Sequence, residues 1–206
     1  ICMASLMASG HVDRILTTNF DPLLVQSCAL FGEFPAVYDF AASQFLKPQL
    51  IPRKSVFYLH GQRSGFVLKN THQELQKHAA YLKPIIDDSL QSRVWVVVGY
   101  SGLSDPVFEL LADVDEFQYG LYWIGYKDQA PADHVRSRLL DVKGKRAYLT
   151  RGYDADQFFD ELIRELNIYP PKLVAKPFTH FNEFLNRVTP EERFKLDFCR
   201  WSSVTF

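Results

Sequence analysis

Cysteine is scarce in this sequence, with only three in 206 residues. Cys2, Cys28 and Cys199 lie far apart and form no C-x-x-C pair, which argues against a structural zinc site and against a disulfide framework. We expect them to be small buried hydrophobic residues in a reducing compartment, which favours the cytoplasm. His72 and His78 are six residues apart and do not share a helix face, so they form no metal pair. The sequence therefore predicts no metal site.

An excess of one charge and long apolar runs are also lacking. The formal net charge is −1, so no basic surplus could hold a nucleic-acid backbone, and we expect no direct nucleic-acid partner. No apolar run reaches the roughly 18 residues of a membrane span, and we find no signal-peptide pattern, so we expect no membrane contact. Aromatic residues are abundant instead: 17 Phe and 10 Tyr predict an unusually aromatic core.

Short apolar runs alternate along the chain with segments of helical pattern. The predicted strands are 14–18, 36–38, 55–59, 93–98, 121–124 and 146–149. The predicted helices are 3–9, 22–31, one or two within 71–90 with a break or kink at Pro84, 106–112, 130–140 and 154–166. Residues 93–98 (RVWVVV) are apolar at nearly every position, which is typical of a strand covered on both faces. The alternation predicts an α/β, Rossmann-like fold, with a mainly parallel sheet and helices on both faces.

A pair of prolines, Pro170-Pro171, marks a boundary near the end of the chain. We expect one domain over residues 1–168. Residues 169–206 are expected to form a helical appendage or the start of a following domain, with short aromatic-rich helices at 179–188 and 190–199. The length of the chain fits one such domain with an appendage.

Small or polar residues follow the predicted strands, at the ends where an open parallel sheet binds its ligands. These segments are 17–21 (TTNFD), His60-Gly61, 99–106 (GYSGLSDP), 125–128 (GYKD) and 151–154 (RGYD). Because the carboxyl ends of parallel strands meet at one edge of a sheet, we expect the segments to converge there. The sequence thus predicts a ligand site at that edge.

Several of these segments, in this order, resemble motifs of the Sir2 family. Residues 17–21 resemble the T-Q-N-I-D motif of sirtuins, and more closely the T-T-N-F-D form of bacterial Sir2-like domains. His60-Gly61 after a strand resembles the H-G motif. Residues 96–106 (VVVGYSGLSDP) resemble the strand and loop that contact the cofactor ribose and phosphate, in their G-Y-S-x-x-x-D-P form. Residues 152–162 resemble the last loop and helix of that fold, so the resemblance covers about residues 1–166.

The sequence departs from the family pattern in two ways. Deacylating sirtuins usually carry four zinc-binding cysteines after the H-G motif, whereas residues 61–98 contain no cysteine, so we expect no zinc. The family's first strand and its glycine-rich G-A-G-x-S phosphate loop also have no match. The chain opens with a helix that ends at Gly10 and runs straight into a buried strand. We therefore expect a fragment whose first strand and loop lie upstream of Ile1, and which by itself binds NAD+ poorly.

The resemblance implies NAD+ as the substrate and three catalytic residues. Cleavage of NAD+ passes through a transition state with positive charge on the ribose, so the site must hold the carboxamide and orient a nucleophile. His60, at the end of an apolar strand, can act as a general base toward water or a ribose hydroxyl. Asn19 can position water or the ribose, and Asp21 is implied to orient the nicotinamide side. Each residue also has a local alternative. His60 could be a buried histidine whose hydrogen bonds are satisfied, Asn19 could organise the turn, and Asp21 could cap the next helix.

Further residues are predicted to contact the cofactor. A glycine at position 99 lets the backbone approach a phosphate or ribose, and the hydroxyl of Ser101 can donate a hydrogen bond. Asp105 is expected to cap the next helix, although it can also reach a ribose hydroxyl. The alternative for this loop is a plain strand-to-helix turn. The full predicted set is Thr18, Gly99, Tyr100, Ser101 and Asp105, with Gly125, Tyr126, Gly152 and Tyr153 on the adenosine half.

Of the possible activities, the resemblance favours an NAD+ glycohydrolase, in which water is the nucleophile and the products are nicotinamide and ADP-ribose. The zinc-free form resembles bacterial Sir2-like effectors of antiviral defence, which destroy NAD+ in infected cells. Such domains usually belong to larger chains or assemblies, so we expect a homo-oligomer or a multidomain assembly. Two alternatives stay open: an NAD-dependent protein deacylase, which the missing zinc module disfavours, and a non-catalytic module that senses NAD+ or ADP-ribose or acts as a scaffold.

Overall fold

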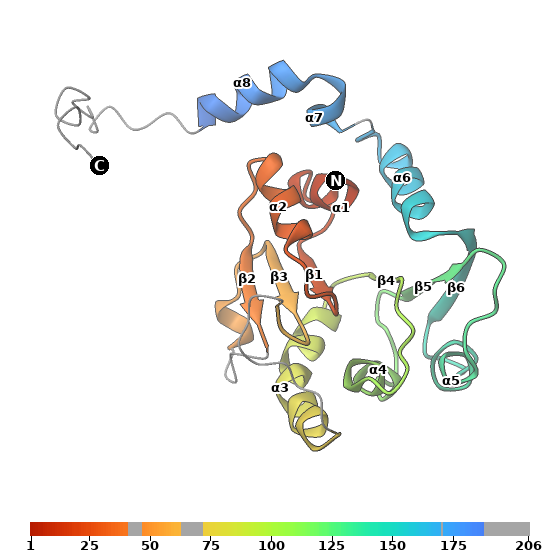
Figure 1. Ribbon diagram of the computed structural model, residues 1–206. Coiled ribbons are helices and arrows are strands. Elements are labelled where there is room, and N and C mark those ends of the chain that lie inside the picture. Colours follow the sequence, from red (N-terminus) through yellow and green to blue (C-terminus); the bar gives the residue numbers. More distant parts are fainter. Residues whose placement is uncertain (41–46, 63–71, 170, 188–206) are drawn as a thin grey trace. The chain divides into compact units, whose positions relative to one another are not determined.

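The computed structural model describes residues 1–40, 47–62, 72–169 and 171–187 (Figure 1). The chain divides into two compact units, Ile1–Pro171 and Lys172–Phe206. The predicted helix at 190–199 lies outside the described residues. Among the helices of the described ranges, none is long and apolar enough to cross a membrane.

The first unit contains two three-stranded parallel sheets, of which the first comes from the N-terminal part of the chain (Figure 1). Its strands, in spatial order, are β1 (Arg14–Thr17), β3 (Ser55–Tyr58) and β2 (Ala36–Asp39). The neighbouring helical elements are α1 (Cys2–Ala8), α2 (Leu23–Leu30) and the 3-10 turn η1 (Pro48–Leu50). The register pairs both Thr17 and Asp39 with Tyr58, so the three strands end at the same level. The segments that follow them therefore start from one edge.

The second sheet is also three-stranded and parallel, but its strands lie in sequence order. Its strands, in spatial order, are β4 (Trp95–Val98), β5 (Leu121–Tyr126) and β6 (Ala147–Tyr153), all parallel. The helices are α4 (Pro106–Ala112), α5 (Asp133–Val135), which continues as the π-helical turn η2 (Arg136–Leu140), and α6 (Ala155–Glu165). Asp154 begins α6 with a capping box, because its carboxylate accepts from the Gln157 N–H while the Gln157 side chain accepts from the Asp154 N–H.

One hydrophobic cluster contains residues of both sheets. The long helix α3 (His72–Leu90) contains Pro84 and packs against α4. Buried side chains from the first sheet, from α3, from α4 and from the second sheet belong to the same cluster; examples are Phe57, Ile85, Phe108 and Trp123. Parallel strands surrounded by helices confirm the predicted α/β, Rossmann-like fold.

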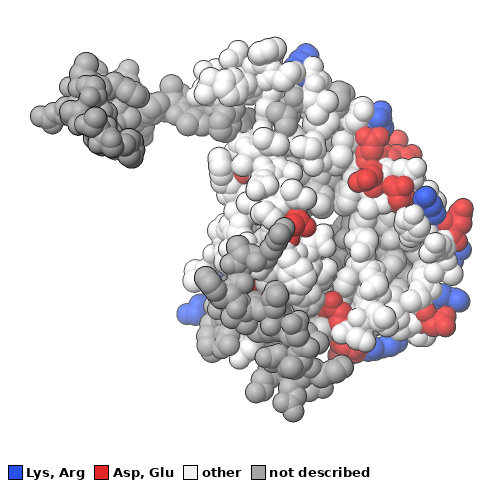
Figure 2. Space-filling model, viewed as in Figure 1, with Lys and Arg blue, Asp and Glu red and all other residues white. Residues whose placement is uncertain are grey.

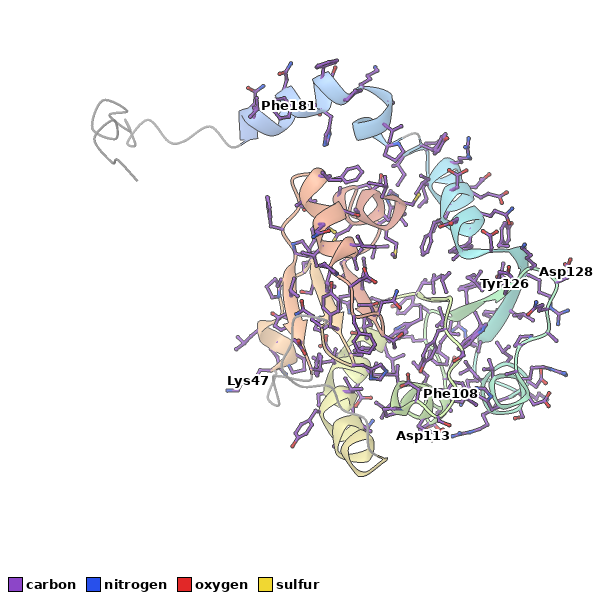
Figure 3. All side chains as sticks on the ribbon, viewed as in Figure 1. Lys47, Phe108, Asp113, Tyr126, Asp128 and Phe181 are labelled. Carbon is purple, nitrogen blue, oxygen red and sulfur yellow. The ribbon has the colours of Figure 1, made fainter. Side chains whose placement is uncertain are left out.

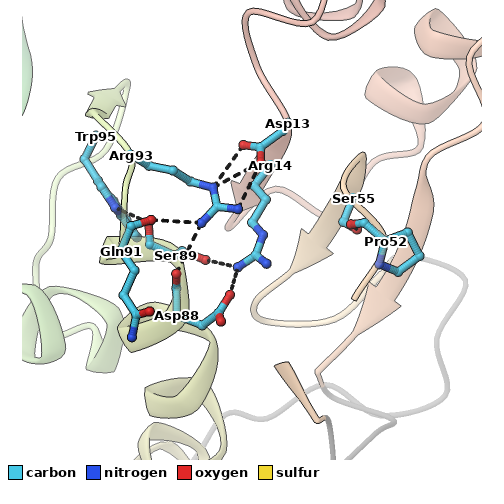
Figure 4. Close-up of polar contacts among 9 residues, drawn as sticks. All are labelled: Asp13, Arg14, Pro52, Ser55, Asp88, Ser89, Gln91, Arg93 and Trp95. Atoms are coloured by element: carbon cyan, nitrogen blue, oxygen red, sulfur yellow. Dashed lines mark hydrogen bonds and ion pairs between the residues drawn. The ribbon is translucent and has the colours of Figure 1, made fainter. Parts of the chain in front are cut away.

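Charged side chains join the two sheets where β1 and β4 begin (Figure 4). The guanidinium of Arg93, just before β4, donates to both carboxylate oxygens of Asp13, just before β1, at 3.0–3.1 Å. Arg14, the first residue of β1, donates to the Ser89 hydroxyl at 2.9 Å and pairs with Asp88, both at the end of α3. These contacts hold the starts of β1 and β4 near each other, which constrains where their carboxyl ends lie.

The prediction that residues 93–98 are covered on both faces is wrong. Val94 and Val96 are 56% and 46% exposed, whereas Trp95 and Val97 pack against the core. Successive side chains of a strand point to opposite faces, and α4 and the core cover only one face of β4 at this level. An apolar run cannot by itself reveal such one-sided burial, because both faces carry the same kind of residue.

Strands β5 and β6 of the second sheet are longer than predicted. Gly125 and Tyr126 belong to β5, and Gly152 and Tyr153 belong to β6, rather than to loops after these strands. The pairing continues past an irregularity, since Ile124 faces Thr150 while Tyr126 faces Tyr153. A β-bulge absorbs the extra residue in β6, and a bulge leaves little trace in a hydrophobic pattern.

Two helices begin later than predicted. Helix α2 begins at Leu23, so Pro22 stands just before it rather than at its first position. The helix predicted from residue 130 begins at Asp133, because Pro131 disfavours the helical conformation of the residue before it.

In the second unit, α7 (Lys172–Ala175) is followed by α8 (Pro177–Arg187). The helix predicted at 179–188 thus begins two residues earlier, with a proline at its first position, where the missing N–H removes no hydrogen bond. Its side chains Phe178, Phe181 and Leu185 are exposed.

Candidate functional site

A histidine and a carboxylate from different sheets meet at the carboxyl ends of the strands. His60 follows β3, and Asp105 ends the loop that follows β4. Nε2 of His60 lies 2.9 Å from Oδ2 of Asp105, and both side chains are largely buried, with 19% and 14% exposed. An ionised carboxylate only accepts, so the bond requires a proton on Nε2, which places the lone pair of the neutral ring on Nδ1. The contact thus fixes both the orientation and the tautomer of the imidazole.

Asp105 has a second partner, because it also caps α4. Its other oxygen, Oδ1, accepts from the Val107 N–H at 2.8 Å, and Pro106 stands at the first helical position. The predicted helix cap is therefore confirmed. Burial would raise the pKa of Asp105, but the hydrogen bonds from His60 and from Val107 outweigh it and hold the pKa below its ordinary value. The carboxylate facing His60 is consequently ionised at neutral pH.

The turn that carries His60 is fixed by the neighbouring strand. The Gly61 N–H donates to the Tyr58 carbonyl at 3.4 Å, and the Gln62 N–H donates to Oδ2 of Asp39, at the end of β2, at 3.2 Å. These bonds hold the chain after β3 in a tight turn. His60 is therefore attached to backbone that is bonded on both sides.

The segment after β1 lies beside this turn, because β1 and β3 are neighbours. The Leu59 N–H donates to the Thr17 carbonyl at 2.9 Å, which continues the ladder to the point where both strands end. The Asn19 N–H donates to the Thr17 hydroxyl at 3.0 Å, and the Asn19 side chain is exposed. The structure thus brings the segments of Asn19 and His60 together at one edge of the first sheet.

Two contacts hold Asp21 in place. Its carboxylate accepts from the Leu23 N–H at 3.0 Å, which satisfies a donor at the start of α2, and its carbonyl accepts from the Tyr58 hydroxyl, also at 3.0 Å. Burial, followed by the charge of Asp21, raises the pKa of Tyr58. Asp21 was predicted to cap this helix, but Pro22 is the N-cap residue and Asp21 bonds the Leu23 N–H from one position earlier. Its orientation of nicotinamide stays a prediction.

The loop after β4 is unusually tight. Gly99, Gly102 and Ser104 all have φ between +52° and +66°, a left-handed conformation that favours glycine. A Cβ atom on Gly102 would lie 2.7 Å from the ring of Phe108 on α4, whereas the space around Gly99 is open (Figure 3 labels Phe108). The loop therefore lies against α4 and leaves the backbone at Gly99 accessible, as a contact with a ribose or phosphate requires.

The other predicted residues of this loop differ in their surroundings. The Tyr100 ring packs on Trp123 at 5.9 Å between centroids. Burial, and then the charge of Asp105, raises the pKa of Tyr100 far above its ordinary value, which keeps the hydroxyl protonated beside that carboxylate. Ser101 is exposed, and its hydroxyl accepts from the Leu103 N–H at 3.4 Å. The cofactor contacts of Tyr100, Ser101 and the half-buried Thr18 stay predictions.

The four residues predicted for the adenosine half lie at the ends of β5 and β6. A Cβ atom on the buried Gly125 would come within 3.3 Å of Leu149, so this glycine allows close packing between strands. Tyr126 is exposed at the end of β5 (Figure 3), Gly152 is exposed, and the Tyr153 ring packs edge-on against Phe158. Their contact with a nucleotide stays a prediction.

No cluster of three or more His, Cys, Asp or Glu that could hold a metal ion occurs within the described part of the chain. The expected lack of zinc stays a prediction. On the face that Figure 2 shows, acidic and basic side chains of the described residues are interspersed rather than gathered into a patch of one sign.

Sequence reasoning missed the bond between His60 and Asp105 and the role of Tyr58. The second had no local signal, because the Tyr58 hydroxyl bonds the carbonyl of Asp21, which is 37 residues away in sequence. The first had none, because the two partners are 45 residues apart in sequence and belong to different sheets.

A family model described as the SIR2-like domain matches residues 13–148, which is well over half of the chain. The chain belongs to the SIR2-like domain family. The match begins just before β1 and ends within β6, so it includes Asn19, His60 and Asp105. No curated protein matches the sequence significantly. The predicted Sir2-like family is thus confirmed, and since Sir2-like domains use NAD+, the function of this domain is related to NAD+.

Proposed function

We propose that this SIR2-like domain is an NAD+ glycohydrolase, which hydrolyses the bond between nicotinamide and ribose. The observation that carries the proposal is the hydrogen bond between His60 and Asp105, at the edge where Asn19 also lies. A buried carboxylate that orients an imidazole is an arrangement suited to general-base catalysis. Family membership supplies the substrate, NAD+, and the pair supplies a group able to activate a nucleophile.

In the proposed step, water attacks the anomeric carbon of the ribose while the bond to the nicotinamide nitrogen breaks. A C–O bond forms, nicotinamide leaves as a neutral base, and the proton lost by water passes to Nδ1 of His60. The carboxylate of Asp105 faces the positive charge that the ring then acquires. The products are nicotinamide, ADP-ribose and one proton, which is finally released to solvent.

The remaining residues of the site would orient the reactants. The Asn19 amide, exposed after β1, can both donate to a ribose hydroxyl and accept from the attacking water. Asp21, whose loop is held by Tyr58, is proposed to face the nicotinamide side. The backbone around Gly99 is proposed to approach the ribose and phosphate, because it is accessible and carries no side chain.

The test measures nicotinamide release from NAD+ by the wild-type protein and by His60→Ala and Asn19→Ala. General-base catalysis typically contributes about 10²- to 10⁴-fold, so His60→Ala should lower kcat by that amount. His11→Ala is the matched control, since this exposed histidine contacts Ser9 near the end of α1. Unchanged turnover in both site variants would exclude the proposed site.

Further measurements distinguish the alternative activities. Release of nicotinamide that depends on an acylated peptide, with transfer of the acyl group, would identify a deacylase. Calorimetric binding of NAD+ or ADP-ribose without turnover would identify a sensing or scaffolding module.

We further propose that the hydrolase acts as a defence effector that depletes NAD+, within a homo-oligomer or a larger assembly. The support is the likeness of its motifs to the zinc-free bacterial Sir2-like effectors. Expression in bacteria should then lower cellular NAD+, and the His60→Ala variant should not.

A further inference from the structure

A second histidine bonds the loop after β4, at a residue nearer to β4 than the one that His60 bonds. His134, the middle residue of the short helix α5, places Nε2 3.0 Å from the backbone carbonyl oxygen of Ser101. A carbonyl oxygen only accepts, so Nε2 of His134 must carry the proton that is shared. The loop is thereby bonded to other elements near both ends: Ser101 to α5 in the second sheet's layer, and Asp105 to His60 from the first sheet.

The ring of His134 is itself held in position. It packs edge-on against Phe108, with 4.9 Å between ring centroids and 84° between ring planes. The same Phe108 ring occupies the space beside Gly102, where a Cβ atom would come within 2.7 Å. Phe108, on α4, therefore contacts both the loop and the histidine that bonds the loop. These contacts hold Ser101 in position relative to α4.

The interior of the loop depends on such contacts. Gly99, Gly102 and Ser104 adopt left-handed conformations, and a segment with glycines has more backbone freedom to lose on ordering than other segments. A hydrogen bond to a backbone carbonyl is well suited to restrict this freedom, because it holds the main chain regardless of which side chains the loop carries.

We propose that His134 is a positioning residue of the cofactor loop, which acts on the affinity for NAD+ rather than on the chemical step. The proposal rests on the function proposed above, since it assumes that this loop contacts the cofactor. His134 bonds the loop three residues from its junction with β4, whereas His60 bonds Asp105 at the other end of the loop. Its loss should therefore loosen the part near Gly99 and Ser101 while the bond between His60 and Asp105 persists.

The first experiment separates KM from kcat. His134→Ala should raise KM for NAD+ about 5-fold, the equivalent of one ordinary hydrogen bond, with kcat near the wild-type value. His134→Gln should recover part of the affinity, because its amide nitrogen can donate to the Ser101 carbonyl. Arg138→Gln is the matched control: it removes the ion pair with Glu109 and the cation above the Phe108 ring from the adjacent η2 turn, without touching the loop. An unchanged KM in His134→Ala, or an equal rise in Arg138→Gln, would overturn the proposal.

The second experiment does not depend on turnover. Amide hydrogen exchange of residues 99–104 should be faster in His134→Ala than in the wild-type protein and Arg138→Gln, and ADP-ribose should bind more weakly to His134→Ala. Equal exchange rates in all three proteins would overturn the positioning role. If the wild-type protein releases no nicotinamide, the proposed function fails, whereas faster exchange and weaker ADP-ribose binding in His134→Ala would still support the loop contact.

Discussion

The two sheets of the first unit are both three-stranded and parallel, but they offer different groups at their carboxyl ends. The first sheet presents side chains with reactive or orienting chemistry, Asn19 and His60, on turns bonded to strands of the same sheet. The second presents a left-handed backbone loop, from Gly99 to Asp105, whose exposed main chain suits contact with a cofactor. Asp105 joins them through His60. The comparison teaches that neither sheet holds the proposed site alone, so contacts between the sheets should matter for activity.

The largest expected effect comes from removing the charge at this junction. In Asp105→Asn the amide oxygen can still accept from the Val107 N–H, so the cap of α4 remains. The amide offers His60 a donor instead of a charged acceptor, which favours the wrong tautomer, and kcat for NAD+ should fall by about 10²-fold or more. The pH dependence of kcat should change as well, whereas circular dichroism should match the wild-type protein. A kcat near the wild-type value would show that the two sheets function independently.

The next effect concerns the opposite ends of the same strands. Arg14→Met removes a guanidinium that is only 7% exposed and leaves Asp88 and Ser89 without it, which should lower the free energy of unfolding by about 3 kcal/mol. Arg93→Gln removes a guanidinium that is 28% exposed, so its loss should be about 1 kcal/mol after screening by solvent. Urea unfolding measures both. If both variants lost the same free energy of unfolding, burial would not decide how strongly the contacts of Arg14 and Arg93 stabilise the protein.

A smaller effect separates two glycines of the same loop. Gly99 and Gly102 have nearly the same φ, +65° and +66°, but only Gly102 lies against Phe108. Alanine at either position should cost about 1 kcal/mol for the left-handed conformation, and Gly102→Ala should lose about 2 kcal/mol more through the clash. Thermal unfolding compares the two variants. If both lose the same stability, the loop can move away from α4 at little cost.

The smallest effect is a pH dependence of stability. The pKa of Asp105 is lower in the folded protein than its ordinary value, so its contribution is complete above the unfolded pKa of about 3.9 and is lost as the pH falls through the folded value. The stability difference between the wild-type protein and Asp105→Asn should therefore shrink with acidification below about pH 4. Urea titrations at several pH values measure this difference in stability. A difference that widens in acid would contradict a lowered pKa of Asp105 in the folded protein.

Particular residues show how far prediction from sequence reached. The runs at 14–18 and 55–59 identified β1 and β3, because apolar strands bounded by polar turns are local patterns. The Asp105-Pro106 start of α4 was equally local. Two other features could not be predicted from local patterns. The exposure of Val96 depends on which face α4 covers, and the bulge near Tyr153 depends on the register of a neighbouring strand.

By itself the sequence determined the order of the strands and helices, the family, and the positions of Asn19, His60 and the loop from Gly99, because these follow from short segments and their spacing. Only the tertiary structure decided that Asp105 faces His60, that Tyr58 holds the loop of Asp21, and that His134 bonds Ser101. Each of these contacts joins residues more than 30 positions apart, and such distances close only when the packing of whole elements brings their ends together.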